Sequence, residues 1–287
     1  MSGLFLQAMA DPEPYQFRLC QPVSIIGSAP TLMSDQYLTL RKSLGQHFLR
    51  DENISRKTIE GLKQQHFQQL LEVGAGGGAL TKYLVEINDI DLKVVEIDNE
   101  KINFLLQTFP ALQNKILHND FLEIEKPFAG KFAVIGNFPY NISSQILFKI
   151  LDWKEDIDFM IGMFQKEVAQ RIAAKEGNKV YGVLSVLIQA FFKVEYLFEV
   201  NEQSFYPPPK VKSAVIMLTP KKEKPNIRTE KDFALLVKVA FNQRRKTLRN
   251  AVKNLFDITV LQDSIFGKRA EQLTVNDFAA LTWKMKK

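Results

Sequence analysis

The segment Ile135-Gly136-Asn137-Phe138-Pro139-Tyr140 follows an apolar run and carries groups suited to methylating an exocyclic amine on a planar base. The lone pair of such an amine is delocalised into the ring, so the nitrogen becomes a nucleophile only when acceptors engage its two N–H groups. Asn137 offers a side-chain carbonyl, and Phe138 offers a backbone carbonyl. Pro139 stiffens the turn, and Tyr140 provides a ring on which a flipped base can stack. The competing interpretation is a strand that ends in an ordinary proline turn.

A glycine-rich turn upstream supports the first interpretation. Residues 69–73 form a short apolar strand, Gly74-Ala75-Gly76-Gly77-Gly78 follows, and residues 79–84 have helical spacing. Such a strand, turn and helix typically admit a nucleotide close to the backbone. A second strand, at 94–98, contains Glu96, which lies 22 residues after Gly74. A carboxylate at this spacing can bind ribose hydroxyls, although a solvated acid at a strand end is the alternative.

The order of these parts separates classes of nucleotide-binding protein. The glycine spacing is G-x-G-x-G rather than the G-x-G-x-x-G of dinucleotide-binding proteins, and no P-loop motif is present. A third strand, at 115–117, precedes Asp120, which can bind an adenine amino group or simply cap a helix. The strand before Asn137 is the fourth. Polar or glycine residues therefore follow all four strands, at the edge where open α/β sheets bind ligands.

Taken together, these motifs resemble those of the ribosomal RNA adenine N6,N6-dimethyltransferases, and most closely the bacterial small-subunit enzymes. Two further segments fit: residues 41–49, similar to the family's K-x-x-G-Q-N-F-L motif, and residues 205–215, similar to F-x-P-x-P-K-V-x-S. The resemblance extends from about residue 40 to the C-terminus. One departure is His47, where the family usually has asparagine.

The resemblance implies a Rossmann-like, S-adenosylmethionine-dependent methyltransferase sheet with a small all-α C-terminal domain. It implies transfer of methyl groups to N6 of adenines in a hairpin of 16S small-subunit rRNA. Two adjacent adenines are expected to be dimethylated, and the modification is expected to contribute to subunit biogenesis. The target adenine is expected between Tyr140 and Phe205. The residues expected at the catalytic site are Asn137, Phe138, Pro139, Tyr140 and Phe205, and those expected at the cofactor are His47, Leu49, Gly74, Gly76, Glu96, Asp120 and Asn137.

A basic segment near the C-terminus is the candidate RNA-binding surface. Residues 241–253 contain five basic side chains and no acidic one. The spacing predicts a helix over 232–256 that presents Arg245, Arg249 and Lys253 on one face, which suits phosphate contacts. A solvated helix face is the competing interpretation. The expected RNA-binding residues are Arg41, Lys42, Arg244, Arg245, Arg249 and Lys253.

Three regions divide the chain. Residues 1–35 lack periodicity and are expected to be a flexible extension, residues 36–220 the methyltransferase domain, and residues 225–287 a helical RNA-contacting domain. Further strands are predicted at 158–163, 193–200 and 213–218, the last two as an antiparallel pair, and further helices at 51–65, 166–175, 181–192 and 274–283.

Composition fits a cytoplasmic RNA-modifying enzyme with an anionic partner, and a monomer is expected. The net charge is +6, Cys20 is the single cysteine, and no apolar run has the roughly 18–20 residues of a membrane helix. The histidines lack metal-ligand spacing, so no metal is expected. Two alternatives stay open: an antibiotic-resistance-type methyltransferase of large-subunit rRNA, and a non-catalytic assembly or transcription factor on the same fold.

Overall fold

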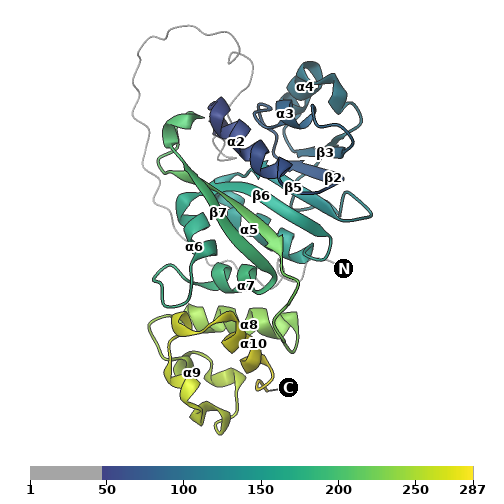
Figure 1. Ribbon diagram of the computed structural model, residues 1–287. Helices are drawn as coiled ribbons and strands as arrows, with labels where there is room; N and C mark the ends of the chain where they lie inside the picture. Colours follow the sequence, from purple (N-terminus) through teal and green to yellow (C-terminus); the bar gives the residue numbers. More distant parts are fainter. Residues whose placement is uncertain (1–46, 287) are drawn as a thin grey trace.

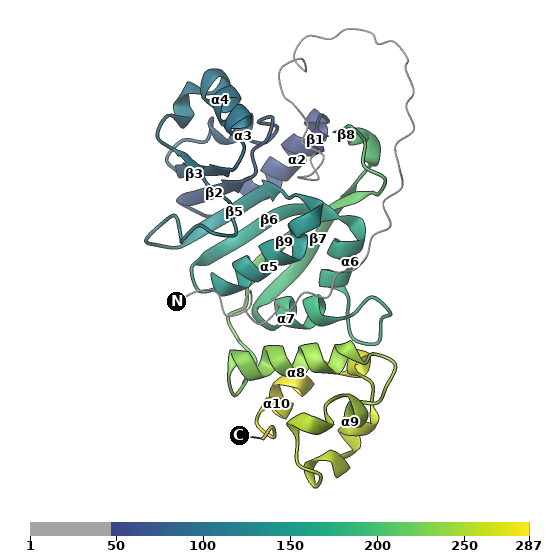
Figure 2. The same ribbon diagram turned by 180° about the vertical axis from the view of Figure 1, so that it is seen from behind.

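The computed structural model describes residues 47–286 and is built on a seven-stranded sheet (Figures 1 and 2). The strand order is β4-β3-β2-β5-β6-β9-β7. Five strands run parallel, and β9 pairs antiparallel with both β6 and β7. The strands are β2 (Gln69–Val73), β3 (Asp91–Glu96), β4 (Ile116–His118), β5 (Phe132–Asn137), β6 (Ile157–Gln165), β7 (Phe192–Val200) and β9 (Ser213–Pro220).

Helices cover both faces of this sheet. One face packs against α2 (Glu52–Lys63), α3 (Thr81–Leu84) and α4 (Asn99–Thr108), and the other against α5 (Ser143–Asp152), α6 (Lys166–Ala173) and α7 (Val183–Phe191). Neighbouring strand residues alternate between the two hydrophobic clusters: Leu70 and Val94 belong to the first, Leu71 and Val95 to the second. Burial on both faces explains why the strands are continuously apolar rather than alternating.

The topology places a ligand site between β2 and β5. From β2 the chain proceeds outwards through β3 to β4 and then returns to β5 on the other side of β2, so the order reverses at this point. Open parallel sheets bind ligands at such a switch point, beyond the carboxyl ends of the strands. A two-stranded antiparallel ladder, β1 (Phe48–Leu49) with β8 (Phe205–Tyr206), joins the two distant motifs that resemble the family.

The predicted strands and most of the predicted helices are present, with boundaries shifted by a few residues. The strand predicted at 94–98 is β3, which ends at Glu96 because the Glu96 carboxylate accepts hydrogen bonds from the next two backbone N–H groups. The predicted antiparallel pair is β7 with β9. The expected extension at 1–35, together with Arg41 and Lys42, lies outside the described residues.

The C-terminal part of the described chain is helical, but the long helix predicted over 232–256 is wrong. Instead, α8 (Glu230–Asn242) ends before a turn, and the short α9 (Leu248–Ala251) follows. The break allows the Leu248 side chain to enter the core, where it is fully buried. The Leu248 backbone N–H donates a hydrogen bond to the Lys268 carbonyl. The last helix is α10 (Val275–Thr282).

The C-terminal helices pack directly on the catalytic part. One hydrophobic cluster runs from the sheet through Leu187 of α7 to Phe233 of α8 and Phe278 of α10. In Figures 1 and 2, α8 lies along α7, with α9 beyond it, and α10 contacts both α8 and α7. The two parts therefore share a core, and the predicted boundary near 221–225 is a change of architecture rather than a gap in packing.

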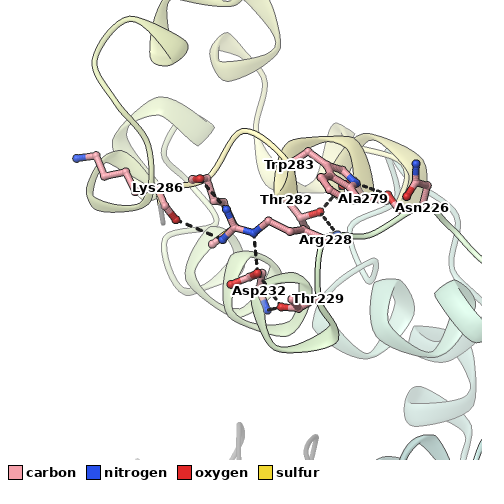
Figure 3. A network of polar contacts seen from close by, with 9 residues as sticks. Asn226, Arg228, Thr229, Asp232, Ala279, Thr282, Trp283 and Lys286 are labelled. Atoms are coloured by element: carbon pink, nitrogen blue, oxygen red, sulfur yellow. Dashed lines mark hydrogen bonds and ion pairs between the residues drawn. The ribbon is translucent and has the colours of Figure 1, made fainter.

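Arg228 fastens the segment that connects the two parts (Figure 3). Its guanidinium donates to Asp232 in α8 (2.8 Å) and to the carbonyls of Met285 (2.8 Å) and Lys286 (3.3 Å) after α10. Its backbone N–H donates to Thr282 Oγ1 at 2.9 Å. These carbonyls belong to the segment that follows α10, so the arginine ties this C-terminal segment to the start of α8. The start of α8 and the end of α10 are thus held together.

Candidate active site

A cavity of about 470 Å³ opens at the switch point, at the carboxyl ends of β2, β3, β4 and β5. This volume lies within the range of small-molecule and cofactor sites. Every residue expected at the cofactor lines it, as do four of the five expected catalytic residues. The structure therefore brings together side chains that the sequence spreads over 94 positions, from His47 to Tyr140.

The glycine turn forms the floor of this cavity. Gly74 has φ +70° and Gly76 has φ +55°, conformations that side-chain-bearing residues rarely adopt. A Cβ at Gly74 would meet no atom within 4 Å, so the space above this glycine is open to a ligand. The glycines therefore serve both to turn the chain and to leave the backbone accessible.

Glu96 holds the glycine turn against the end of β3. Its Oε2 accepts a hydrogen bond from the Gly76 N–H (3.0 Å), and its Oε1 accepts from Ile97 (3.0 Å) and Asp98 (3.1 Å). The side chain is 5% exposed and lines the cavity. A carboxylate has about four acceptor positions, so one remains for a ligand hydroxyl. The predicted role at a ribose fits this geometry, and the structure adds a role in fixing the turn.

Glu72 is a second buried carboxyl group beneath the turn, and the sequence did not assign it a function. It is 2% exposed, lines the cavity and accepts a hydrogen bond from Thr81 Oγ1 at 2.8 Å. Burial raises the pKa of Glu72 to about 8, with a smaller contribution from the charge of Glu96. Its position two residues before the first glycine was the available sequence signal.

Asp120 combines the two roles that the sequence left open. Its Oδ1 accepts from the Leu122 N–H at 2.8 Å, which is the capping contact of a turn. The residue also lines the cavity, beside Phe121. One carboxylate oxygen is thus engaged in the turn, and the carboxylate has further acceptor positions for a ligand amino group.

The Asn137-Phe138-Pro139-Tyr140 turn forms the opposite wall. The Asn137 amide donates to the His47 carbonyl (3.4 Å), which identifies the amide oxygen as the group left to accept from a substrate. Phe138 is 1% exposed, and its ring packs over two strand glycines, Gly136 and Gly162. A Cβ at Gly162 would lie 2.3 Å from the ring, and a Cβ at Gly136 would lie 2.6 Å from the Val73 carbonyl, so neither position has room for a side chain. The buried ring anchors the turn, and Phe138 lines the cavity.

Tyr140 and His47 form a ring pair at the cavity. Their centroids are 5.6 Å apart with an interplanar angle of 29°. His47 Nδ1 donates to the Pro207 carbonyl at 2.7 Å, and the Tyr140 hydroxyl bonds with Ser213 Oγ at 2.5 Å. Burial raises the pKa of Tyr140. His47 thus lines the cavity as predicted, but its ring contacts the Tyr140 platform and the proline-rich segment.

Phe205 is not placed as the sequence predicted. It is 3% exposed in the hydrophobic cluster beneath the β1–β8 ladder and does not line the cavity. Its neighbour Tyr206 is 47% exposed, lines the cavity and lies under the Arg50 guanidinium, 3.9 Å from the ring centroid. Successive side chains of a strand point to opposite faces, so only one of the pair can face the cavity. For Phe205 to touch a bound base, β8 would have to move.

The predicted RNA-binding residues separate into two groups. Arg245, Arg249 and Lys253 are exposed, on the turn after α8, on α9 and just beyond it. Arg244 instead forms an ion pair with Glu271 at 2.7 Å. Arg249 belongs to the exposed group, although its Nε donates a hydrogen bond to the Leu261 carbonyl. The exposed cations thus come from three local structures rather than from one helix face.

Similarity to known proteins agrees with this geometry. A family model described as ribosomal RNA adenine dimethylase matches residues 37–284. The chain belongs to the ribosomal RNA adenine dimethylase family. It is 51% identical over 251 residues to a protein of Cytophaga hutchinsonii named ribosomal RNA small subunit methyltransferase A, covering 84% of this chain and 95% of that one. A protein of the same name from Flavobacterium johnsoniae is 50% identical over 250 residues, covering 85% and 95%.

Solved structures support the same fold. A dimethyladenosine transferase from Plasmodium falciparum has a TM-score of 0.70 at 27% identity, covering 81% of this chain and 94% of that one. The 23S rRNA methyltransferase ErmE has a TM-score of 0.64 at 23% identity, covering 84% and 100%. The chain is therefore an S-adenosylmethionine-dependent methyltransferase with a Rossmann-like sheet.

The residues of the cavity fit this cofactor. S-adenosylmethionine supplies an activated methyl group on a positively charged sulfur and also carries an ammonium group and a ribose. Among the carboxyl groups that line the cavity, Glu96 and Asp120 can complement these groups by charge and hydrogen bonding, and the buried Glu72 can complement them by hydrogen bonding. In the described residues, no cluster of three or more His, Cys, Asp or Glu side chains could hold a metal ion. Nor does the described chain contain a helix with the length and apolarity needed to cross a bilayer.

Replacing Glu96 with alanine should weaken S-adenosylmethionine binding by about 1–3 kcal/mol, the scale of a hydrogen bond to a charged group. Titration calorimetry measures this, with Glu86→Ala as an acidic control away from the cavity. Melting of the unliganded proteins separates the ligand contact from the loss of the three backbone hydrogen bonds. Unchanged affinity for S-adenosylmethionine in Glu96→Ala would show that this carboxylate does not contact the cofactor.

Glu72 should make the stability of the unliganded enzyme depend on pH. Its pKa is raised from 4.5 to about 8 on folding, so the free energy of unfolding should fall as pH rises between these values, by up to about 1.4 kcal/mol per unit. The Glu72→Gln variant should lack this component. Urea unfolding from pH 5 to 9 measures the difference between the two proteins. Identical pH profiles would show that the buried carboxyl group is not neutral in the folded state.

Proposed function

We propose that this enzyme transfers methyl groups from S-adenosylmethionine to N6 of two adjacent adenines in a hairpin of 16S small-subunit rRNA, dimethylating each. The observation that carries the proposal is the Asn137 amide, whose nitrogen donates to the His47 carbonyl and so leaves its oxygen to accept from an amine. Identity of about 50% to proteins named ribosomal RNA small subunit methyltransferase A supports small-subunit rRNA as the substrate.

The proposed chemistry depends on positioning rather than on a strong base. The target adenine leaves its stack and lies against Tyr140, while the Asn137 side-chain oxygen and the Phe138 carbonyl accept its N–H groups. The nitrogen lone pair is then directed at the cofactor methyl group. Methylation makes the amine acidic, so its proton can pass to water. The second methylation needs a pocket that tolerates the loss of one N–H.

The proposed setting is the cytoplasm, where a monomer acts on an assembling small subunit. Exposed cations at Arg245, Arg249 and Lys253 support contact with rRNA phosphates. A large-subunit substrate and a non-catalytic role are the alternatives. Assaying methyl transfer to undermethylated small-subunit particles, in parallel with naked large-subunit RNA, tests all three. Activity on the particles alone is expected, preference for large-subunit RNA would contradict the substrate, and inactivity on both would contradict catalysis.

The Tyr140 platform gives a separate prediction. Tyr140→Ala should lose about 1–3 kcal/mol of base stacking, seen as a fall in kcat/KM for RNA. Tyr140→Phe keeps the ring but leaves the buried Ser213 hydroxyl without its partner, so the unfolding free energy should fall by about 1 kcal/mol. Tyr196→Phe, at a partly exposed hydroxyl, is the matched control. If Tyr140→Ala matched the wild type on RNA, the base would stack elsewhere.

A further inference from the structure

A second cavity, of about 300 Å³, lies beside the active site and is not explained by cofactor binding. It is formed between the start of α6 and the segment that leads into β9. Its lining residues are Gln165, Lys166, Glu167, Gln170, Val211 and Lys212, none of which lines the cofactor cavity.

Ser213 connects the two cavities. Its hydroxyl bonds with Tyr140 in the first cavity, its chain neighbour Lys212 lines the second, and its cross-strand partner Gln165 lines the second as well. Cross-strand partners are about 4.5–5.5 Å apart. Stacked nucleotides in one strand are about 3.4 Å apart, and more when extended. The second cavity is therefore within one or two nucleotide steps of the Tyr140 platform.

The lining combines apolar surface with two glutamine amides, a combination that can accommodate the face and the edge of a base. Among the described residues, neither the Gln165 nor the Gln170 amide has a hydrogen-bond partner, and a glutamine amide can pair with both N6 and N7 of adenine. Val211, 45% exposed, offers an apolar surface to a base.

The charges are mixed, and only one cation is available for phosphate. Lys166 pairs with Glu199 at 2.8 Å, and Glu167 pairs with Arg171 at 2.5 Å. Lys212 is exposed and forms no close ion pair within residues 47–286, although its charge also acts on Glu199. One exposed cation can contact a phosphate, and a glutamine amide can pair with an adenine edge, so these groups can together bind one nucleotide.

We propose that the second cavity seats the adenine adjacent to the one undergoing methylation, with the glutamine amides on its N6 and N7 edge. This inference rests on the proposed function, because it requires an RNA substrate with two neighbouring adenines. The two bases then occupy the two cavities in turn. While one adenine is at the cofactor, its neighbour is held out of the stack rather than left free to compete.

A double-mutant cycle, in which the enzyme and the RNA substrate are each altered, tests whether the second cavity binds the neighbouring adenine. The enzyme variant is Gln170→Ala with Val211→Ala, both at exposed positions. The substrate change is a small-subunit particle reconstituted with rRNA whose neighbouring adenine is replaced by 7-deaza-adenine or by an abasic nucleotide. Gln64→Ala, exposed just after α2 and leading into the amino end of β2, is the matched control enzyme.

Each single change should lower kcat/KM by about tenfold, the scale of one interaction with a base, with cofactor affinity unchanged. Combining them should cause little further decrease, because the same interaction is removed twice. If the two decreases multiply, or if the enzyme variant behaves like Gln64→Ala, the neighbouring base is not in this cavity. Wild-type enzyme that does not methylate the unmodified particle would overturn the proposed function itself, which separates the two failures.

Discussion

Replacing Asn137 with alanine should lower kcat for methyl transfer by about 10²–10³-fold, the scale for removing one preorganised polar group from a transition state. The Asn137 oxygen is the group that engages the target amine, whereas the cofactor retains Glu96, Asp120 and the glycine turn. Cofactor affinity should therefore change much less than kcat. Single-turnover methylation of small-subunit particles and calorimetry with S-adenosylmethionine measure the two effects separately.

Two controls sharpen this prediction. Asn88→Ala, which does not line the cavity, should match the wild type in both measurements. The loss of the Asn137–His47 hydrogen bond can loosen β1, and a fall in cofactor affinity equal to the fall in kcat would indicate that this is the main effect. Full activity in Asn137→Ala would contradict the proposed activation of the amine.

Reversing Arg245, Arg249 and Lys253 to glutamate should lower affinity for small-subunit particles by an amount on the order of 10²–10³-fold at low salt. Every phosphate interaction that the substitutions remove should reduce the log–log salt slope by about 0.7–0.9. Cofactor binding should be unchanged, since these residues do not line the cavity. Filter binding across a salt series gives both affinity and slope.

The matched control reverses Lys63, Lys126 and Lys131, which are exposed near the amino edge of the sheet, so that both variants change the net charge by the same amount. These changes alter net charge without touching the proposed platform, so their effect measures long-range electrostatics alone. Equal decreases in affinity for the two variants would mean that net charge, and not direct contact, attracts RNA. Unchanged affinity and slope in the variant of the proposed platform would mean that the platform cations face solvent.

The features predictable from sequence were those with local signals. The glycine turn, Glu96 and the proline turn follow buried strands, and the sheet brings strand ends to one edge, so their meeting at a cavity was expected. The family resemblance added the N-terminal motif, which β1 carries to the same place.

The features that escaped prediction depend on packing between distant segments. Nothing local indicates that Ser213 holds the Tyr140 hydroxyl, because the two lie 73 residues apart. The choice between Phe205 and Tyr206 depends on which side of a two-residue strand faces the core. The helix break after Asn242 is likewise decided by the core that Leu248 enters, since residues 241–253 contain neither glycine nor proline to mark it.

The shared core of α7 and α8, together with the Arg228 clasp, has a consequence for how a substrate is chosen. The exposed cations beyond α8 lie in the helical C-terminal part, which shares a hydrophobic core with the part of the chain that forms the catalytic cavity. If these cations bind a helical stretch of rRNA backbone as proposed, the enzyme would select a target adenine by its distance from that stretch. Lengthening that rRNA helix by one base pair would shift the adenines out of register, even though every base near the cavity stayed the same.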